Sequence, residues 1–436
     1  MTGAKKMTQN ESTLTPKLRF PEFRNDPAWT PVTLRDVSVP IEEKVGDRKL
    51  TPVSISAGIG FVPQAEKFGR DISGNQYKIY TVVRDGDFVY NKGNSLRFPQ
   101  GCIYQLRGWG EVAAPNVFIC FRLKEGYTGG FFQSCFEKNI HGIQLQRHIT
   151  SGARSNGLLN ISRDTFFHIR IPTPSLAEQQ KIADCLSTLD ELIEAESRKL
   201  DALKDHKKGL MQRLFPREGE TRPRFRFPEF RDAHEWRERS VSDLLVKVSI
   251  PVKVKEDEVY REIGVRSHGN GIFHKSPNAG KALGEKRVFR VVENALVLNI
   301  VFAWEQAVAT TSRLEADMIA SHRFPMYVSK EGECDVRFLK YAFLTPRGKQ
   351  LLGIASPGGA GRNRTLGQDE FEKLRLRVPT GEEQVRIADA IDAANESIAA
   401  QSAKLEALRI HKGGLMQQLF PNPSEFESWA QFRSRA

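Results

Sequence analysis

Apolar residues recur at alternating steps of four and three along two stretches of the chain, and each stretch ends in a nearly identical peptide. The peptides are HKKGLMQRLFP at 206–216 and HKGGLMQQLFP at 411–421. Such spacing, sustained for about five heptads between charged residues, is typical of coiled-coil helices. We therefore predict two long helices, 175–216 and 380–421. Their predicted seam residues are Ile182, Leu186, Leu189, Ile193, Leu200, Leu203, Leu210, Leu214, Ile387, Ile391, Ala394, Ile398, Leu405, Leu408, Leu415 and Leu419.

Each predicted helix also has a start signal. Ser175 stands three positions before Glu178, and Thr380 three before Glu383, which predicts a capping box at both N-termini. An alternative interpretation is that each helix lies alone on its own domain. The narrow apolar stripe favours pairing, because a helix facing a globular core usually shows a wider apolar face.

The two helical stretches are copies of one unit. Residues 178–216 and 383–421 are identical at 22 of 39 aligned positions. A second match, FPEFR, occurs at 20–24 and again at 227–231, each time followed by a tryptophan a few residues later. The chain is therefore a tandem repeat with a shared beginning and a shared tail.

Between these matched ends, the middle segments 30–170 and 237–377 show almost no similarity to each other. Short runs such as DFVYNKGNS, NVFICFRL, NALVLNIVFAW and FPMYVS indicate strands, and DVRFLKYAFLTPRGKQLL indicates a helix. We predict an α/β (α+β) fold in which two mixed, strand-rich domains accompany the long helices. A shared tail with different middles suggests one structural task and two different recognition tasks.

Composition narrows the class of protein. The 436 residues contain 39% hydrophobic residues and no apolar run of about 18 residues that could span a bilayer. The first residues lack the apolar stretch of a secretory signal, so we expect a cytoplasmic protein. Five cysteines without CxxC pairing suggest neither a zinc site nor disulfides. The net charge of +12 makes a polyanionic partner plausible.

Motifs for catalysis are missing from the sequence. It contains no N/D-P-P-F/Y tetrapeptide of an amino-methyltransferase, no GxxxxGK[ST] phosphate loop and no HExxH. AGIGF at 57–61 could resemble a cofactor loop, but an ordinary turn is the better interpretation. The repeated His206 and His411 favour a solvated or interface role. We therefore predict no catalytic, cofactor-binding or metal-binding residue in this chain.

Four basic, glycine-containing loops in the middle segments are candidates for DNA contact: 91–98, 147–157, 266–276 and 356–365. Arginine reads guanine and asparagine reads adenine in the major groove, while lysine holds phosphates. For any one residue, a solvated loop side chain remains the alternative. The candidate residues are Asn91, Lys92, Asn94, Arg97, Arg154, Asn156, Arg266, Asn270, Lys275, Arg362, Asn363 and Arg364.

The helix starts EQQKIAD and EQVRIAD, the ends KGLMQRLFP and GGLMQQLFP, and the two different middles make the chain resemble the specificity (S) subunits of type I restriction-modification enzymes. The resemblance covers nearly the whole chain. It implies two target recognition domains and two helices that pack antiparallel as a spacer between them. The implied divisions are an N-terminal tail 1–17, recognition domains 18–174 and 225–379, spacer helices 175–216 and 380–421, a linker 217–224 and a C-terminal tail 422–436.

The resemblance also implies partners. A specificity subunit docks two methyltransferase (M) subunits, and restriction/translocase (R) subunits join through them, on double-stranded DNA with a bipartite, asymmetric target. S-adenosylmethionine, ATP and Mg²⁺ would then belong to the partner subunits and not to this chain. Two other functions stay open at this point: a coiled-coil scaffold that binds protein only, and a self-contained DNA-modifying enzyme with unrecognised motifs.

Overall fold

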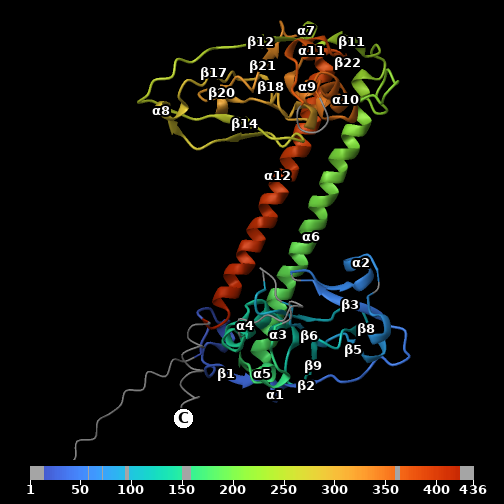
Figure 1. Ribbon diagram of the computed structural model, residues 1–436, viewed down its shortest axis with the longest axis vertical. Helices are drawn as coiled ribbons and strands as arrows, with labels where there is room; N and C mark the ends of the chain where they lie inside the picture. The colour runs from blue at the N-terminus through green and yellow to red at the C-terminus, as the bar shows by residue number, and fades with distance from the viewer. Residues whose placement is uncertain are drawn as a thin grey trace, which may run out of the picture. The chain divides into compact units, whose positions relative to one another are not determined.

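The computed structural model forms two compact units. It describes residues 14–56, 58–70, 72–93, 98–149, 159–358 and 364–422. Unit 1 comprises residues 1–196 with 404–436, and unit 2 comprises residues 197–403. Helices α6 (Leu176–Leu214) and α12 (Gly381–Gln418) are each continuous and each contribute to both units (Figure 1). None of the helices within the described ranges is long and apolar enough to cross a membrane.

Unit 1 contains two four-stranded sheets, ordered β2-β9-β6-β7 and β4-β3-β8-β5, and the separate pair β1-β10. All pairings are antiparallel except that of β3 with β8. The elements are η1 (Pro21–Phe23), β1 (Thr30–Thr33), α1 (Leu34–Val37), β2 (Ser38–Pro40), β3 (Thr51–Ser56), β4 (Gly60–Pro63), α2 (Gln64–Phe68), η2 (Gly74–Ile79), β5 (Thr81–Arg84), β6 (Phe88–Asn91), β7 (Cys102–Gln105), β8 (Glu111–Ala114), β9 (Ile119–Leu123), α3 (Gly129–Glu137), α4 (Ile140–Leu145), η3 (Gln146–His148), α5 (Arg163–Phe167) and β10 (Arg170–Thr173).

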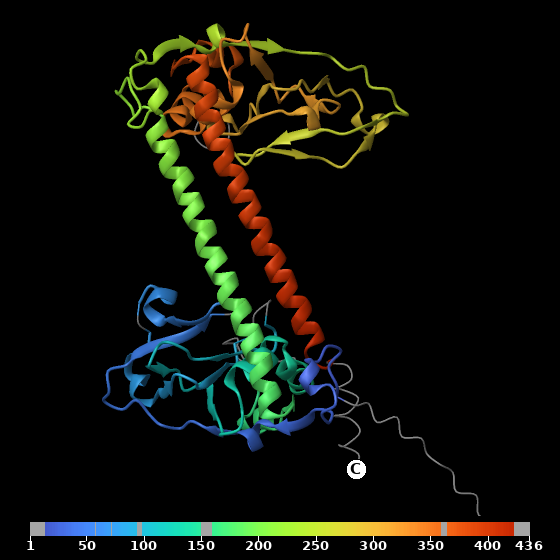
Figure 2. The same ribbon diagram turned by 180° about the vertical axis from the view of Figure 1, so that it is seen from behind.

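Unit 2 contains one four-stranded antiparallel sheet, ordered β12-β21-β18-β19, and the pairs β11-β22, β13-β16, β14-β15 and β17-β20. In both views, β14, β17 and β20 reach away from the side of this unit that holds α9 and α10 (Figures 1 and 2). The elements are η4 (Pro228–Phe230), β11 (Arg237–Ser240), α7 (Val241–Leu244), β12 (Leu245–Val248), β13 (Val259–Tyr260), β14 (Ile263–Val265), β15 (Ile272–His274), β16 (Asn278–Ala279), α8 (Gly280–Leu283), β17 (Val288–Arg290), β18 (Leu296–Leu298), η5 (Ala303–Glu305), β19 (Val308–Thr310), η6 (Arg313–Glu315), β20 (Ile319–Ser321), β21 (Met326–Ser329), α9 (Val336–Leu344), α10 (Pro346–Ile354), α11 (Gln368–Lys373) and β22 (Arg375–Val378).

The two units share one framework despite their dissimilar middle sequences. The sheet β2-β9-β6-β7 of unit 1 has the same strand order along the chain as β12-β21-β18-β19 of unit 2. In each unit, the strand that opens the domain pairs with the strand that precedes the next long helix, β1 with β10 and β11 with β22. The predicted mixed fold of two strand-rich domains with long helices is confirmed. The units differ in their remaining strands.

The end of α12 completes the core of unit 1, although it belongs to the second repeat. Phe420 is 1% exposed and stacks on Phe131, with ring centroids 5.5 Å apart. It also meets the ring of Trp29 edge-on, at 5.9 Å between centroids. Leu419 is buried in the same core. The LFP sequence is therefore a core-forming element, and aromatic rings of this size contribute much of the buried apolar area.

The end of α6 plays the same part in unit 2. Phe215 stacks on Phe338 at 5.3 Å and meets Trp236 edge-on at 6.1 Å. Leu214 is 1% exposed in the same core. Each copy of the repeated peptide therefore fills the domain whose other residues come from the other repeat. This arrangement explains why the chain carries the peptide twice.

The long helices run antiparallel within each unit. In unit 1, Lys404 at the start of the α12 portion contacts Glu196, at 2.5 Å, whereas Lys412 further along contacts Asp190, at 2.6 Å. In unit 2, the end of α6 and the start of α12 share one core. All sixteen predicted seam residues are buried or half-buried. Those nearest the helix ends pack into the domain cores, namely Ile182, Leu186, Leu415 and Leu419 in unit 1 and Leu210, Leu214, Ile387 and Ile391 in unit 2.

A buried ion pair fixes the start of α6 to the residues before FPEFR. Arg19 donates two hydrogen bonds to the carboxylate of Glu178, at 2.8 and 2.6 Å, and both side chains are less than a tenth exposed. The same guanidinium donates to the carbonyls of Asp26 and Pro27. Trp29 Nε1 adds a third donor to Glu178 at 3.3 Å. These bonds satisfy a charge pair that would otherwise be costly to bury.

Unit 2 repeats this anchor. Arg226 donates to Glu383 at 2.8 and 2.6 Å and to the carbonyls of Ala233 and His234. The hydrogen bonds that each arginine donates to its glutamate raise the pKa of that arginine, so both guanidinium groups stay charged. One difference is that Trp236 Nε1 is buried without a hydrogen-bond partner.

The predicted capping boxes are wrong in their carboxylate half. The backbone N–H of Glu178 does bond to Ser175 Oγ, at 3.4 Å, but the carboxylate of Glu178 binds Arg19. Likewise, Glu383 binds Arg226 and does not return to the residue at Thr380. Where both groups are buried, two hydrogen bonds from a guanidinium to a carboxylate are stronger than one bond from a neutral backbone N–H. The glutamate carboxylate therefore pairs with the arginine and does not cap the helix.

The glutamine of each EQ pair has its own task. Gln179 accepts a hydrogen bond from Thr128 N and donates to Pro174 O, both at 3.0 Å. Gln384 makes the same two bonds, to Asp335 N and Pro379 O, also at 3.0 Å. Thr128 and Asp335 are the N-caps of α3 and α9. The EQ motif therefore joins each long helix to the N-terminus of α3 in unit 1 or α9 in unit 2.

We expect the Phe420→Ala substitution to destabilise unit 1 by about 3–5 kcal/mol, because it removes a fully buried ring. Phe215→Ala should do the same to unit 2. Hydrogen exchange resolved by peptide measures each unit separately. Phe68→Ala, at a ring 46% exposed, serves as the control. Equal loss of protection in both units from either single substitution would contradict this assignment.

We expect Arg19→Met to destabilise unit 1 by about 3–5 kcal/mol, because Glu178 would remain buried and unpaired. The double substitution Arg19→Met with Glu178→Leu should recover most of this loss, since no buried charge remains. Urea unfolding monitored by Trp29 fluorescence tests the pair. Additive losses in the double variant would show that the two residues do not act together.

Candidate nucleic-acid interface

The segment after β6, which begins the candidate loop 91–98, meets the segment that follows the candidate loop 147–157. We name this site loop cluster 1 and define it as residues 91–93, 98–101 and 159–163. Leu159 N donates to Lys92 O at 2.9 Å, and Lys92 Nζ donates to Ile161 O at 3.4 Å. These bonds bring the segment after β6 against the segment before α5. Residues 94–97 and 150–158 of the two candidate loops lie outside the described residues.

A hollow of about 600 Å³ adjoins loop cluster 1. It is lined by Lys92 and Arg163 among mostly polar side chains. The remaining lining residues are Asn116, Val117, Phe118, Ile119, His148, Leu159, Asn160, Ile161, Ser162 and Thr165. Two cations with amide and hydroxyl groups are the chemistry that contacts phosphates and base edges.

Asn91, proposed as a base contact, is used to shape the loop. Its Oδ1 accepts from Gly93 N at 2.8 Å, and its Nδ2 donates to Ile55 O at 3.2 Å. Gly101 closes the loop with a φ of +79°, and a Cβ there would lie 2.5 Å from Asn91 O. Asn91, Gly93 and Gly101 are thus held in place by backbone and side-chain constraints together.

Six of the candidate DNA contacts lie outside the described residues. They are Asn94, Arg97, Arg154, Asn156, Arg362 and Asn363.

In unit 2, residues 266–271 of the candidate loop 266–276 form a hairpin turn between β14 and β15 that packs on the β18–β19 connection, and residues 272–274 are not a loop but the strand β15. His268 N donates to Glu305 O at 2.7 Å, and Gly269 N donates to Gln306 O at 3.0 Å. Ser267 Oγ adds a bond to the carboxylate of Glu305 at 2.9 Å. We name residues 266–271, 299–306 and 364–367 loop cluster 2.

The β18–β19 connection at 299–306 was missed by the sequence interpretation, which read NALVLNIVFAW as one strand. That prediction is wrong beyond Leu298, where β18 ends. The side chain of Asn299 accepts from Val301 N at 3.1 Å, and Phe302 N donates to Asn299 O at 3.0 Å, so the chain turns. Asparagine initiates such turns by bonding its own nearby backbone. The asparagine within the apolar run was the available signal.

The third segment of loop cluster 2 meets this connection directly. Leu366 N donates to Ile300 O at 2.8 Å, which corresponds to the bond from Leu159 to Lys92 in unit 1. Arg364, an exposed candidate, lies over the ring of Trp304 at 5.8 Å. The aromatic ring limits the freedom of the guanidinium at the surface.

The remaining candidates of unit 2 differ in which groups of the protein already bind their polar side chains. Arg266 is exposed, stacks over Phe273 at 4.9 Å and donates to Ile272 O at 3.1 Å. Asn270 donates to Ser267 O at 2.9 Å within the turn. These two side chains are therefore held at the surface by local bonds. The guanidinium of Arg266 lies over an aromatic ring, as that of Arg364 does.

Lys275, by contrast, is engaged by an acid. It contacts Glu262 at 3.2 Å, and Lys286 contacts the other oxygen of the same carboxylate. Burial acts to raise the pKa of Glu262, but the hydrogen bonds from Lys286 and Lys275 outweigh it and lower the pKa. The carboxylate stays charged and neutralises part of the lysine pair, so Lys275 is the weakest of the described DNA-contact candidates.

Comparison with known proteins shows which family part of this chain resembles. Residues 114–205 match the family described as "Type I restriction modification DNA specificity domain". This segment runs from the end of β8 to the middle of α6 and contains the EQ motif and its partner Thr128. This segment is therefore similar to type I DNA specificity domains.

Two curated relatives come from Methanocaldococcus jannaschii. The type I restriction enzyme MjaVIII specificity subunit is 35% identical over 116 residues, which cover 24% of this chain and 27% of that protein. The putative type I restriction enzyme MjaX specificity subunit is 33% identical over 79 residues, or 18% of this chain and 17% of that protein. The chain thus spans about a quarter or less of the length of these relatives in the matched regions.

A solved structure extends the likeness to nearly the whole chain. The S subunit of a type I restriction-modification system from M. genitalium matches with a TM-score of 0.56, covering 94% of this chain and 100% of that one. At 12% identity, this likeness concerns the fold. The resemblance to type I specificity subunits is confirmed, by sequence over one segment and by fold over most of the chain.

We expect Gly101→Ala to destabilise loop cluster 1 by about 2–4 kcal/mol, because the new methyl group would both require a strained backbone and meet Asn91 O. Gly108→Ala is the matched control, since Gly108 has a φ of +73° but open space around its Cβ position. Peptide-resolved hydrogen exchange of β6 and β7 gives the measurement. Equal effects of the two substitutions would show that the close approach at Gly101 is unimportant.

Proposed function

We propose that this chain is the DNA sequence-specificity subunit of a type I restriction-modification complex and has no catalytic activity of its own. The observation that carries this proposal is the duplicated anchor around two different domains, together with the specificity-domain match at 114–205. Two domains with one framework and different surface loops suit the reading of two different half-sequences. The partner methyltransferase subunits would perform the chemistry.

Loop clusters 1 and 2 would provide the reading surfaces. Arg266 and Arg364 are exposed and each lies over an aromatic ring, which suits a guanidinium that must present a fixed plane to a guanine. Lys92 and Arg163 at the hollow of unit 1 suit phosphate or base contacts. The net charge of +12 supports binding to the DNA backbone.

The helices would set the distance between the two half-sites and dock the partners. Apolar side chains remain exposed along them, including Leu192 at 42% and Ile410 at 67%, which is consistent with a protein surface that packs there. We infer that two methyltransferase subunits bind the specificity subunit and that restriction/translocase subunits join through them. S-adenosylmethionine, ATP and Mg²⁺ would be held by those partners.

The first experiment is to co-express the chain with its methyltransferase partner in a host that lacks the modification and to map methylated adenines by single-molecule sequencing. The proposal expects a split motif with an unread gap. A continuous motif would contradict the role of the helices as a spacer. A soluble complex that methylates nothing would favour a protein-only scaffold, and methylation by the chain alone would favour a self-contained enzyme.

We expect the insertion of one heptad into both α6 and α12 to lengthen the unread gap by about three base pairs, since seven helical residues rise about 10 Å. The insertions belong in the middle of each helix, where they leave the cores at the helix ends intact. A target library with randomised gap lengths provides the measurement. Insertion into one helix alone is the control and should abolish modification. An unchanged gap in the double insertion would contradict the spacer role.

A further inference from the structure

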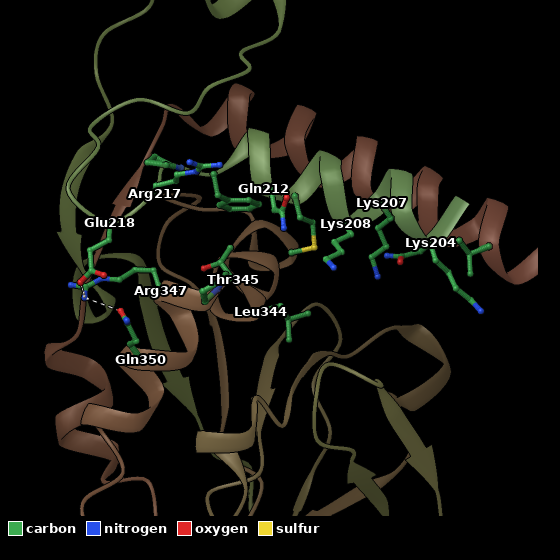
Figure 3. Close-up of a pocket in the computed structure, with 16 residues that line it drawn as sticks. Lys204, Lys207, Lys208, Gln212, Arg217, Glu218, Leu344, Thr345, Arg347 and Gln350 are labelled. Carbon is green, nitrogen blue, oxygen red and sulfur yellow. Dashed lines mark hydrogen bonds and ion pairs between the residues drawn. The ribbon is translucent and has the colours of Figure 1, made fainter. Parts of the chain in front are cut away.

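A groove of about 810 Å³ opens in unit 2 beside the end of α6. Figure 3 shows Lys204, Lys207 and Lys208 in a row along the helix, with Leu344 and Thr345 on the α9–α10 side. None of its lining residues belongs to loop cluster 2. The apolar part of the lining consists of Met211, Phe215, Pro216, Leu344, Pro346 and Ile398.

The basic side of the groove lacks matching acids. Lys204 contacts Asp201 at 3.4 Å on the same helix, but no carboxylate among the described residues lies within ion-pair distance of Lys207 or Lys208. Burial lowers the pKa of Lys207, and the charge of Asp392 acts against this at longer range. The groove therefore places an under-compensated cation beside an apolar floor.

The matched place in unit 1 shows what chemistry satisfies such a site. Lys412 is the repeat counterpart of Lys207, and its Nζ lies 2.6 and 2.8 Å from the carboxylate oxygens of Asp190. It also lies 3.6 Å from Glu137 at the end of α3. In unit 2 the corresponding residues are Asn395 and Leu344, neither of which carries a charge. Unit 2 therefore has the matched lysine, Lys207, but neither of the two acids that contact Lys412 in unit 1.

The apolar part of the site shows the same contrast. In unit 1, Lys138 crosses over Phe420, with its Nζ 5.5 Å from the ring centroid, and donates to Met416 O at 2.8 Å. The matched residue in unit 2 is Thr345, which is too short to cover Phe215. Unit 1 therefore fills this place with its own side chains, and unit 2 leaves it open.

We propose that this groove binds an acidic, amphipathic segment of a partner protein, once per chain. A carboxylate of the segment takes the place that Asp190 and Glu137 occupy around Lys412, and an apolar side chain covers Phe215 and Leu344. A protein segment fits better than DNA, because a phosphate backbone supplies the charge but no aliphatic side chain for the floor. This inference does not rest on the proposed function.

The test measures binding to the purified full chain by fluorescence anisotropy. The probe is a labelled helical peptide of roughly 15 residues, with leucines at i, i+3, i+4 and i+7 and glutamates on both sides of the leucine face. Two control peptides replace the glutamates by glutamine or the leucines by serine. Both controls should bind at least about tenfold more weakly than the probe.

Substitutions in the chain locate the binding. Lys207→Gln removes the cation, and Asn395→Asp supplies the acid that unit 1 has, so both should weaken the probe by about fivefold to tenfold. Asp190→Asn, which removes the corresponding acid from unit 1 and leaves the groove of unit 2 intact, should not weaken probe binding. Thermal unfolding of each variant checks its fold, and both groove variants lower the charge of the groove by one unit, the first by removing a cation and the second by adding an anion.

Three results would overturn the proposal. The first is unchanged probe binding in both groove variants. The second is equal binding of the serine peptide, which would make the groove a simple anion site. The third is competition by a short DNA duplex, together with an equal loss of duplex binding in Lys207→Gln, which would assign the groove to phosphate. Because duplex binding is measured on the same variants, failure here is distinguishable from failure of DNA recognition.

Discussion

The burial of each helix end in a core begun by the other repeat is the constraint on which the structure depends. Phe420 closes the core around Trp29 and Phe131, and Phe215 closes the core around Trp236 and Phe338. Each core is completed by a phenylalanine from the end of the other repeat's long helix. This requirement fixes the direction of the helices within each unit, because the start of one must meet the end of the other. It also explains why the two ends of the repeated tail remain alike while the middles differ.

The anchor residues and the loops are under different physical demands. The arginine, glutamate, glutamine and phenylalanine of the anchor are buried and bonded, so a change in one leaves an unsatisfied partner or a cavity. The loop clusters lie at strand ends, where Lys92 and Leu159 or Ile300 and Leu366 keep one backbone bond but the side chains around it vary. A single framework can therefore present two unlike surfaces. Such a division suits recognition of two unlike sequences.

The sequence predicted the parts of the fold that depend on periodicity. The long helices and the strand runs around β6, β9 and β21 follow from local spacing and composition. The single helix predicted from DVRFLKYAFLTPRGKQLL is two helices, α9 and α10, because Thr345 caps a second helix that begins at Pro346. It could not predict that Glu178 would bind Arg19, because a capping box and a buried ion pair use the same residue at the same position. It also missed the turn at Asn299, where one polar residue inside an apolar run decides the chain direction. For the candidate DNA contacts, the residue types could be read from the sequence. The bonds that occupy Asn91 and Lys275 could not, because their partners Ile55 and Glu262 are distant in the sequence.

The groove of unit 2 shows how a duplicated framework loses symmetry. Lys207 and Lys412 occupy matched positions, and each helix also carries a methionine and a phenylalanine at matched positions, Met211 and Phe215 in unit 2 and Met416 and Phe420 in unit 1. The helical side of the site therefore has the same residues in both units. The difference arises from the three facing residues, which supply two acids and a long aliphatic chain in unit 1 and none of these in unit 2. Lys207 is half-buried and has no ion-pair partner among the described residues, so a carboxylate from outside the chain would stabilise its charge. The groove is open in unit 2 and filled by side chains in unit 1. A partner that binds it would therefore bind one unit and not the other.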